Sequence, residues 1–312
     1  MFDGWPPPVL DPAGPYATSV SLLSWILFAM GAAVLLVVLA ALYVALFGRR
    51  ELQAKVGGKT AVWAGGVAFP LIVLTALLFY GLSLTRHLSD PIRGDELRVR
   101  ITGEMWWWRV AYLDGQGREV VQDANELHIP AGRPIVLELQ SADVIHSFWV
   151  PRLSGKLDMI PGRRNLMRIQ ADEPGIFGGQ CAEYCGGPHA LMGFTVIAHE
   201  PAQFTRIMEA RVARQATAVV PAGPGAQLFE STGCAACHRI AGTGANGLAG
   251  PDLTHVGSRR TLGAGVLPNN RGTLMGWIGN SQAIKPNNRM PPYTVLSAEQ
   301  LAQLATYLEA QK

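Results

Sequence analysis

Cys181-Ala-Glu-Tyr-Cys-Gly-Gly-Pro-His-Ala-Leu-Met192 places two thiols, an imidazole, a thioether and a carboxylate on twelve consecutive residues. Thiolate and thioether sulfur favour copper over hard ions, whereas a zinc site gains little from a methionine. Two glycines and a proline at 186–188 exclude one regular helix or strand. The stretch therefore predicts a loop folded around metal, although Cys181 and Cys185 alone could instead form a disulfide.

A further metal-binding side chain lies upstream of this loop. Residues 141–151 read Ser-Ala-Asp-Val-Ile-His-Ser-Phe-Trp-Val-Pro, with His146 inside a strand-like apolar run. A lone histidine in such a run is more often structural. Together with the loop, however, His146 completes a set of copper ligands.

The region around both features, residues 96–200, alternates short apolar runs with turn residues. Seven short strands separated by Gly, Pro and Asp predict a β-sandwich. The expected strands are 97–102, 106–112, 126–129, 135–139, 144–150, 166–170 and 194–198. On this interpretation His146 closes one strand and the loop joins the last two, so that the ligands converge at one end of the sandwich.

Two long apolar stretches precede the sandwich. Residues 22–47 and 60–85 are each 26 residues without a charge, and about 20 apolar residues suffice to cross a bilayer core. They predict a transmembrane hairpin, in which Pro70 is a tolerated kink. Helices buried in a soluble core are the alternative, but those are usually shorter and carry a polar stripe.

The charges that flank these stretches predict their orientation. Loop 48–59 carries Arg49, Arg50, Lys55 and Lys59 against one acid, whereas residues 1–21 contain no Lys or Arg. The positive-inside rule places this loop in the cytoplasm, so segment 1–21 and everything after about residue 86 are expected outside. Because the start has no basic n-region and no small-residue cleavage site, the first span is expected to act as its own export signal.

Cys234-Ala-Ala-Cys237-His238 has the CxxCH pattern of covalent c-type haem attachment, in which both thiols bind the vinyl groups and the histidine becomes an axial ligand. Residues 226–233 predict a short helix before the motif, and residues 297–311 predict a last helix with Ser297 as N-cap. The Gly- and Asn-rich loop between them is too long to be ordered without a cofactor. Residues 225–312 therefore predict a helical haem domain.

Met290, in Asn-Arg-Met-Pro-Pro-Tyr, is the expected second axial ligand, with Met275 and His255 as alternatives. Residues 201–224 begin as a short helix and become a Pro/Gly/Ala linker, which predicts a tethered haem domain.

The two outer domains carry opposite net charges. Residues 95–200 contain 14 acids and 10 bases, a net charge of −4, and residues 225–312 contain 4 acids and 7 bases, a net charge of +3. Opposite signs favour docking of the domains, although imbalances this small can equally be solvated surface.

These features together resemble subunit II of a haem-copper cytochrome c oxidase, of the type with a fused C-terminal cytochrome c domain. The resemblance covers essentially the whole chain. It implies a multidomain membrane protein with a two-helix transmembrane hairpin, a cupredoxin-like β-sandwich (95–200) and a C-terminal all-α class I cytochrome c domain (225–312).

The resemblance also implies a dinuclear copper centre, in which two thiolates bridge both metals and two imidazoles bind one each. Its ligands would be Cys181, Cys185, His146, His189, Met192 and the backbone carbonyl of Glu183. The carboxylate of Glu183 would face a Mg or Mn ion shared with the catalytic subunit. Trp106 would be the residue through which electrons enter, with packing at the sandwich edge as the alternative; packing is the stronger interpretation for Trp107 and Trp108.

The sequence thus predicts the electron-input subunit of a respiratory terminal oxidase. Electrons from cytochrome c or another external donor would pass through haem c to the copper pair and on to the haem of subunit I, where dioxygen is reduced. The chain alone is expected to transfer electrons, and the oxidase activity to belong to its complex with subunits I and III. The alternatives are the electron-input subunit of a copper-containing nitric oxide reductase and a copper-delivery or assembly factor; a quinol oxidase subunit would lack Cys181 and Cys185.

The expected location is a bacterial plasma membrane, with the copper and haem domains on the periplasmic side, in contact with lipid and without a nucleic-acid partner. Many members of the family carry a carboxylate at the cytoplasmic start of the second span, which helps to admit protons. Here Lys59 precedes the uncharged residues 60–85, so proton uptake through this subunit is not expected. The donor and the haem type of the partner stay open.

Overall fold

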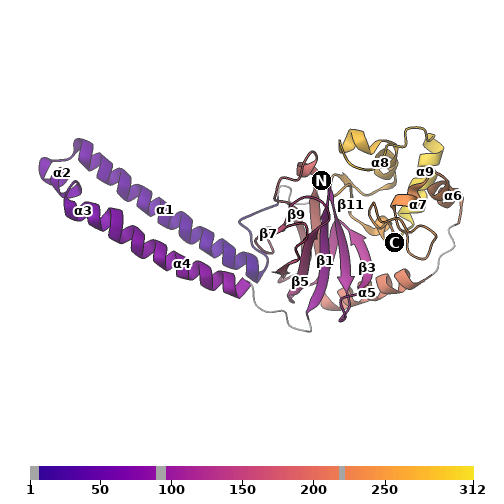
Figure 1. Cartoon of the computed structure of the whole chain (residues 1–312), viewed down its shortest axis with the longest axis horizontal. Helices are drawn as coiled ribbons and strands as arrows, with labels where there is room; N and C mark the ends of the chain where they lie inside the picture. Colours follow the sequence, from indigo (N-terminus) through magenta and orange to yellow (C-terminus); the bar gives the residue numbers. More distant parts are fainter. Residues whose placement is uncertain (1–6, 89–95, 218–221) are drawn as a thin grey trace. The chain divides into compact units, whose positions relative to one another are not determined.

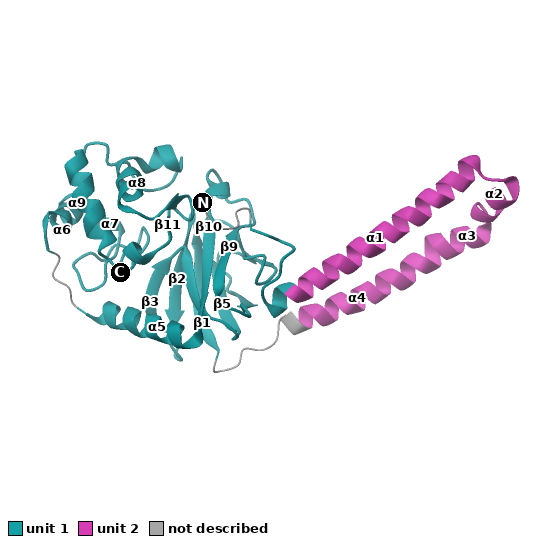
Figure 2. Ribbon diagram, turned by 180° about the vertical axis from the view of Figure 1, so that it is seen from behind, with its two compact units in different colours: residues 1–17, 92–312 teal, residues 18–91 magenta. Residues whose placement is uncertain are grey.

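The computed structural model describes residues 7–88, 96–217 and 222–312. Residues 1–6 of the expected outer segment, residue 95, and residues 218–221 of the expected linker lie outside the described part of the chain. The chain forms two compact units, one of Thr18–Pro91 and one of Met1–Ala17 with Ile92–Lys312 (Figure 2).

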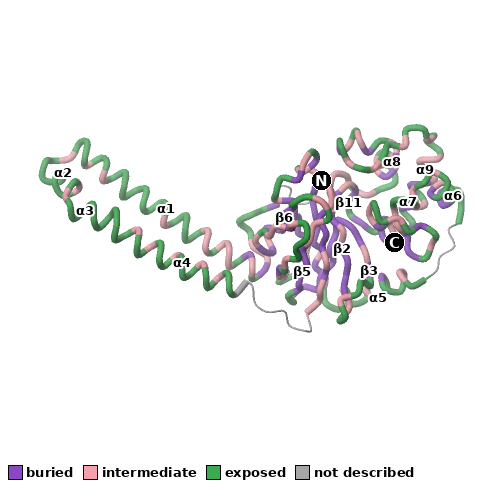
Figure 3. Tube along the Cα trace, in the orientation of Figure 1, coloured by how far each residue is buried: buried purple, intermediate pink, exposed green. Residues whose placement is uncertain are grey.

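The unit Thr18–Pro91, magenta in Figure 2, is a pair of long antiparallel helices. Helix α1 (Pro15–Phe47) is followed by α2 (Arg50–Val56), α3 (Lys59–Trp63), the π-helical η1 (Ala64–Ala68) and α4 (Phe69–Leu88), as Figure 1 shows. Two helical stretches, Pro15–Phe47 and Arg50–Arg86, are long and apolar enough to cross a membrane. Most of their residues are coloured as exposed in Figure 3, and the exposed residues include many large apolar ones, as expected of helices that lipid would cover.

Two prolines explain where these helices differ from the expected stretches 22–47 and 60–85. Helix α1 begins at Pro15, because a proline at the first helical position loses no hydrogen bond. Pro70 lies in α4 directly after the π-helical turn Ala64–Ala68. Since Pro70 has no N–H and its ring displaces the carbonyl of residue 66, the widened turn absorbs the defect.

The other unit, teal in Figure 2, contains a sandwich of two five-stranded sheets, called here the sandwich domain (residues 96–199). One sheet has the order β3-β2-β1-β5-β8 and the other β4-β10-β9-β6-β7. The strands are β1 (Leu97–Glu104), β2 (Trp107–Leu113), β3 (Glu119–Ala124), β4 (Glu126–Pro130), β5 (Ile135–Ser141), β6 (His146–Trp149), β7 (Lys156–Met159), β8 (Asn165–Ile169), β9 (Gly175–Cys181) and β10 (Gly193–His199).

Aromatic side chains fill the space between the sheets at the end where the expected ligands lie. The ring centroid of Trp108 lies 5.7 Å from that of Phe148 and 5.8 Å from that of Phe194, and all three side chains are buried. Edge-to-face contacts of this kind are favourable and rigid. These contacts hold the strand ends that carry the expected ligands in a fixed position.

Three strands escaped the sequence analysis, which expected seven. Half of the residues in β3 and in β7 are polar or charged, and β9 reads Gly-Ile-Phe-Gly-Gly-Gln-Cys, where three glycines hide the alternation of a strand. The position of His146 was also wrong: it begins β6 rather than closing a strand.

The C-terminal domain (residues 222–312) is mostly helical. It consists of α6 (Pro224–Ser231), α7 (Cys234–Cys237), the 3-10 turn η3 (Val256–Ser258), a two-stranded ribbon of β11 (Thr261–Leu262) and β12 (Leu267–Pro268), α8 (Arg271–Ile284) and α9 (Ala298–Glu309). Helices α6 and α8 both pack against α9 around a small apolar core. Ser297 caps α9 with a reciprocal capping box, as the sequence predicts.

A helix is expected at the start of segment 201–224, and the structure has one at residues 201–216. They form α5 (Pro201–Ala216), which packs on β3, β4 and β10 of the sandwich domain. Arg211 of α5 is buried and pairs with the buried carboxylate of Asp123 on β3. This pair joins residues far apart in the sequence, so no local pattern could indicate it.

The carboxylate of Asp123 also forms a salt bridge with the C-terminal domain. Arg259 donates to Asp123 Oδ1 at 2.8 Å, so two guanidinium groups keep the pKa of Asp123 well below its usual range despite burial. Beside it, Glu126 Oε1 accepts the backbone N–H groups of Arg260 at 2.7 Å and Thr261 at 3.1 Å. The two domains are therefore docked by specific buried contacts.

Candidate metal centre and haem cavity

The ligand loop, residues 181–192, connects β9 to β10 at one end of the sandwich domain. A hydrogen bond from Cys181 N to Met192 O, 3.0 Å long, closes the loop at its base. A second bond, from Ala182 N to Ser147 O at 2.9 Å, ties it to β6. The loop turns at Gly186, whose φ of +104° strongly favours glycine, and ends in the 3-10 turn η2 (His189–Leu191).

All six expected copper ligands come together in this loop and at the start of β6. The two thiol sulfurs lie 3.8 Å apart, and ligand atoms of His146 and both cysteines lie within 4.8 Å of one another. The remaining contacts are His146 Nδ1 to Cys181 Sγ at 3.9 Å, His189 Nδ1 to Cys185 Sγ at 3.4 Å, Met192 Sδ to Cys185 Sγ at 3.8 Å, and Glu183 O to Cys181 Sγ at 3.2 Å. The side chain of Glu183 is exposed and takes no part in the cluster.

The chemistry of this donor set fits soft metal ions. The contact with Cys185 lowers the pKa of Cys181, while the same contact and burial raise the pKa of Cys185, so the two thiols ionise as a coupled pair. Two adjacent thiolates therefore require a compensating cation between them. Two thiolates, two imidazoles, a thioether and a carbonyl are the ligand types that copper favours.

Asp143 orients His146 from the side away from the thiols. Its Oδ1 lies 2.9 Å from His146 Nε2, which leaves Nδ1 directed at the sulfurs. The other oxygen, Oδ2, accepts the N–H of Met105 at 2.8 Å. Gly103 makes room for the imidazole, because a Cβ there would lie 2.7 Å from His146 Cδ2. The sequence analysis did not single out Asp143, although its position three residues before His146 was a visible signal.

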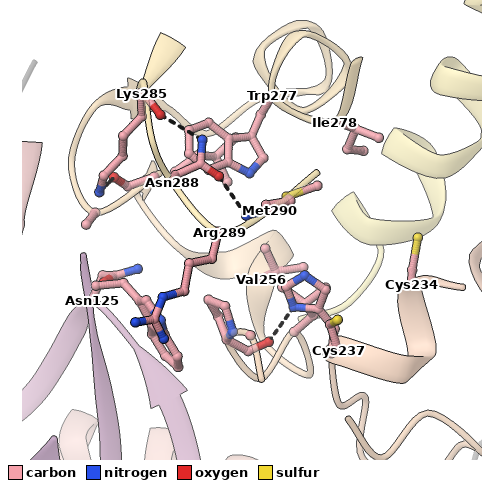
Figure 4. Close-up of a pocket in the computed structure, with 18 of the residues that line it drawn as sticks. Asn125, Cys234, Cys237, Val256, Trp277, Ile278, Lys285, Asn288, Arg289 and Met290 are labelled. Carbon is pink, nitrogen blue, oxygen red and sulfur yellow. Dashed lines mark hydrogen bonds between the residues drawn. The ribbon is translucent and has the colours of Figure 1, made fainter. Parts of the chain in front are cut away.

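A cavity of about 380 Å³ fits the expected haem. Its wall includes Cys234, Cys237, His238 and Met290, several of which Figure 4 labels. His238 Nδ1 lies 2.8 Å from the carbonyl of Pro251, which directs the other ring nitrogen inward as an iron ligand requires. Burial lowers the pKa of His238, so the imidazole is neutral at neutral pH and can bind metal.

Met290 lies on the loop after α8, where its backbone is held firmly. Its N–H donates to Asn288 Oδ1 at 2.8 Å, and its carbonyl accepts from Ser281 Oγ at 3.1 Å and Gln282 Nε2 at 2.9 Å. Among the described residues that line the cavity, neither Met275 nor His255 is found. The geometry therefore favours Met290 over both alternatives.

The sandwich domain contributes to the same cavity through the turn between β1 and β2. Trp106 and Trp107 both line it. The indole Nε1 of Trp106 also donates a hydrogen bond of 2.8 Å to the backbone carbonyl of Cys185 in the ligand loop. Trp106 thus contacts the cavity and an expected copper ligand, whereas Trp108 is fully buried in the sandwich core.

Lys285 is a second residue that the sequence analysis missed. It is 2% exposed, and its ammonium group donates to three backbone carbonyls, two of them in the sandwich domain. Burial lowers the pKa of Lys285 to about 7, and the Cys185 sulfur acts in the opposite direction. Three carbonyl acceptors match the three N–H donors of the charged form.

Comparisons with known proteins match one family within the sandwich domain and another in the C-terminal domain. The family model for the periplasmic domain of cytochrome c oxidase subunit II matches residues 110–199, and the model for cytochrome c matches residues 222–312. Cytochrome c oxidase subunit 2 of Alkalihalophilus pseudofirmus is 37% identical over 97% of this chain and 90% of its own length. The subunit 2 of Bacillus subtilis is 28% identical over 85% of this chain and 78% of its own.

One solved structure similar to the chain is the periplasmic domain of subunit II of cytochrome oxidase from Bradyrhizobium japonicum. It is 31% identical, covers 38% of this chain and 95% of its own length, and has a TM-score of 0.35.

Proposed function

The chain belongs to the cytochrome c oxidase subunit II family, in the form that carries a C-terminal cytochrome c domain, and from this membership we propose its route of electron input. As a member it is part of an oxidoreductase complex that uses copper and haem c. We propose that it receives electrons from an external donor at the C-terminal domain and delivers them, through the ligand loop, to the catalytic subunit I for the reduction of dioxygen.

The proposed cofactors are one covalently bound haem c and a pair of copper ions, each of which would take up and release one electron at a time. Cys234 and Cys237 would hold the haem, with His238 and Met290 as axial ligands. The copper pair would be held by the six ligands described above. Fixed thiolates and imidazoles on a closed loop keep the ligand geometry nearly the same in both redox states, which favours fast transfer.

Trp106 is the residue that we propose for electron input to the ligand loop. The observation that carries this role is its double contact: the side chain lines the cavity, and its indole N–H donates to Cys185 O at 2.8 Å. An aromatic ring followed by one hydrogen bond to a ligand residue provides a short bonded path. Trp107 lines the cavity as well but has no described hydrogen bond to the loop, and it therefore offers a matched comparison.

We further propose a bacterial plasma membrane location, with α1 and the α3–α4 stretch as the two spans and with the sandwich and C-terminal domains outside. The proposed boundaries are those expected from the sequence, with α5 as a docked connector. Subunits I and III, cytochrome c or another donor, and lipid are the proposed partners. The exposed carboxylate of Glu183 is available for a Mg or Mn ion completed by subunit I.

The test is made on the purified complex. We expect two coppers and one haem c per chain, a mixed-valence copper signal in electron paramagnetic resonance, and consumption of dioxygen with reduced cytochrome c. Consumption of nitric oxide in place of dioxygen would instead support a nitric oxide reductase, and binding of zinc or of a single copper would reject the metal assignment.

The role of Trp106 is tested by Trp106→Ala beside Trp107→Ala. We expect Trp106→Ala to slow electron transfer from haem c to copper about tenfold or more, because its path to Cys185 is lost. Trp107→Ala is expected to leave the rate within about twofold of wild type. Rapid-mixing absorbance follows both cofactors; an unchanged rate in Trp106→Ala with intact copper absorbance would reject the role.

A further inference from the structure

Residues 285–290 of the C-terminal domain, called here the bridging segment, contain an unusual buried cation. The Nζ atom of Lys285 donates to Trp106 O at 2.6 Å, to Leu191 O at 2.8 Å and to Gly263 O at 2.9 Å. Figure 4 shows Lys285 beside the loop that carries Asn288 and Met290. One side chain therefore connects the Trp106 turn, the end of the ligand loop and the C-terminal domain.

A lysine at this position is costly for the fold. Removing an ammonium group from water is strongly unfavourable unless an ion pair or complete hydrogen bonding offsets the lost solvation. In the part of the chain that the structure describes, no carboxylate forms a salt bridge with Lys285. Its hydrogen-bond partners are all backbone carbonyls, and stability by itself would be served better by an apolar side chain.

The positions of the three carbonyls indicate the structural role of the Lys285 ammonium group. Trp106 contacts Cys185, and Leu191 immediately precedes the expected ligand Met192. An ammonium group that binds both carbonyls fixes the separation between the Trp106 turn and the ligand loop. A backbone hydrogen bond from Gly193 N to Ala264 O, 2.9 Å long, also joins the end of the ligand loop to the C-terminal domain.

The bridging segment continues from this point to the haem cavity. A Cβ on Gly187 of the ligand loop would lie 3.2 Å from the side chain of Asn287, so the two segments are in close contact. Arg289 lies 3.5 Å from Asp143, the partner of His146. The next residue is Met290, in the cavity wall. The bridging segment thus contacts the ligand loop and Asp143 and ends at the expected haem ligand Met290.

We propose that Lys285 is a positioning residue for electron transfer, which holds Trp106 and the ligand loop at a fixed distance from the haem-binding loop through its three carbonyl contacts. This inference rests on the proposed function. Arginine would not replace lysine fully, because its planar guanidinium cannot direct three donors at carbonyls that surround a single point.

The experiment compares Lys285→Met with Arg214→Met in the full-length chain within its complex. Methionine is unbranched and close to lysine in volume, but it leaves three carbonyls without their donor, which loosens the contact. Arg214 of α5 also donates to a carbonyl of the C-terminal domain, Ala241 O at 2.7 Å, and contacts neither Trp106 nor the ligand loop. It therefore controls for a general loss of domain docking.

Two readouts are needed. Hydrogen exchange measures the amides of the ligand loop and the Trp106 turn without any need for turnover, and rapid-mixing absorbance measures transfer from haem c to copper. For Lys285→Met we expect exchange in these segments to rise about tenfold and the transfer rate to fall about tenfold. For Arg214→Met we expect both to stay within about twofold of wild type.

The outcomes separate this inference from the proposed function. Absence of haem-to-copper transfer in the wild type would contradict the proposed function itself. With wild-type transfer present, normal exchange and rate in Lys285→Met, or an equal loss in Arg214→Met, would overturn the positioning role. If Lys285→Met fails to retain copper, Lys285→Gln, which keeps two N–H donors, is measured in its place against the same expectations.

Discussion

Asp143 illustrates how much of the metal centre depends on a residue that binds no metal. Its two oxygens accept from different partners, His146 Nε2 and the N–H of Met105. Hydrogen bonding to these groups lowers the pKa of Asp143 even though burial acts against it, so the carboxylate is charged at neutral pH. One side chain thereby fixes both an expected ligand and the turn that carries Trp106.

Asp143→Asn should weaken copper binding by about 10- to 100-fold, the usual effect of losing a partner of a metal-binding histidine. The amide oxygen can accept from only one side, and its NH₂ group then faces the other N–H donor. Copper retained after dialysis against a graded chelator series measures the change. Asp158→Asn makes the same chemical change on β7, opposite Ser147, and is the control. Equal retention of copper in both variants would contradict the role of Asp143.

At the scale of the elements, the C-terminal domain depends on a close approach between α6 and α9. A Cβ on Gly225 would lie 2.3 Å from the backbone oxygen of Gln303 and 2.7 Å from Tyr307 Cβ. Because a backbone oxygen inside a helix cannot move aside, even one methyl group there forces the two helices apart. The first and last helices of this domain therefore meet at a glycine.

Gly225→Ala should destabilise the C-terminal domain by about 1–3 kcal/mol through this overpacking. Gly276→Ala in α8 is its matched control, since a Cβ there meets nothing within 4 Å, and alanine should stabilise the helix by up to about 1 kcal/mol. Thermal unfolding followed by haem absorbance compares the two variants. A Gly225→Ala variant that melts as high as Gly276→Ala would contradict the packing argument.

The elements also show what the sequence could predict. The fold class is confirmed, because apolar spans, alternating strands and the CxxCH motif are local signals. Helix α8 was taken for loop because its residues include Gly272, Gly276 and Gly279, yet the capping box of Asn270 and Thr273 begins it and packing of its apolar face completes it. The residues of this capping box are visible in the sequence, whereas the packing that completes the helix is not.

The candidate site likewise contains residues that the sequence could reveal and residues that it could not. The ligand loop could be found because its residues are consecutive, and His146 because a strand end places it nearby. Lys285 could not be found, since it acts on carbonyls of Trp106 and Leu191, and backbone acceptors leave no trace in a sequence. The pairing of Asp123 with Arg259 likewise exists only once both domains have folded.

At the scale of the whole outer unit, docking of the two domains depends on buried charge. Burial, together with the nearby Asp123, raises the pKa of Glu126 from its ordinary value of 4.5 to about 7. Between these two values the folded protein binds a proton that the unfolded chain has already released. The stabilisation is therefore fully present below pH 4.5 and is lost as the pH rises through about 7.

Glu126→Gln should remove this pH dependence. The amide keeps an oxygen for the N–H groups of Arg260 and Thr261 but cannot ionise. Between pH 4.5 and 8, the free energy of unfolding of the wild type should fall relative to the variant by an amount on the order of 3 kcal/mol. Denaturant titrations at several pH values measure this difference, and parallel pH profiles for the two proteins would contradict it.

The docking of both domains through α5 has a kinetic consequence. The C-terminal domain meets the Trp106 turn at an effective concentration set by its own chain, of the order of millimolar even for a loosely tied domain. A freely diffusing haem protein would have to reach that concentration to compete for the same surface. Delivery of electrons to the ligand loop is thus expected to be first order and insensitive to dilution, while only the loading of the C-terminal domain by its donor depends on supply.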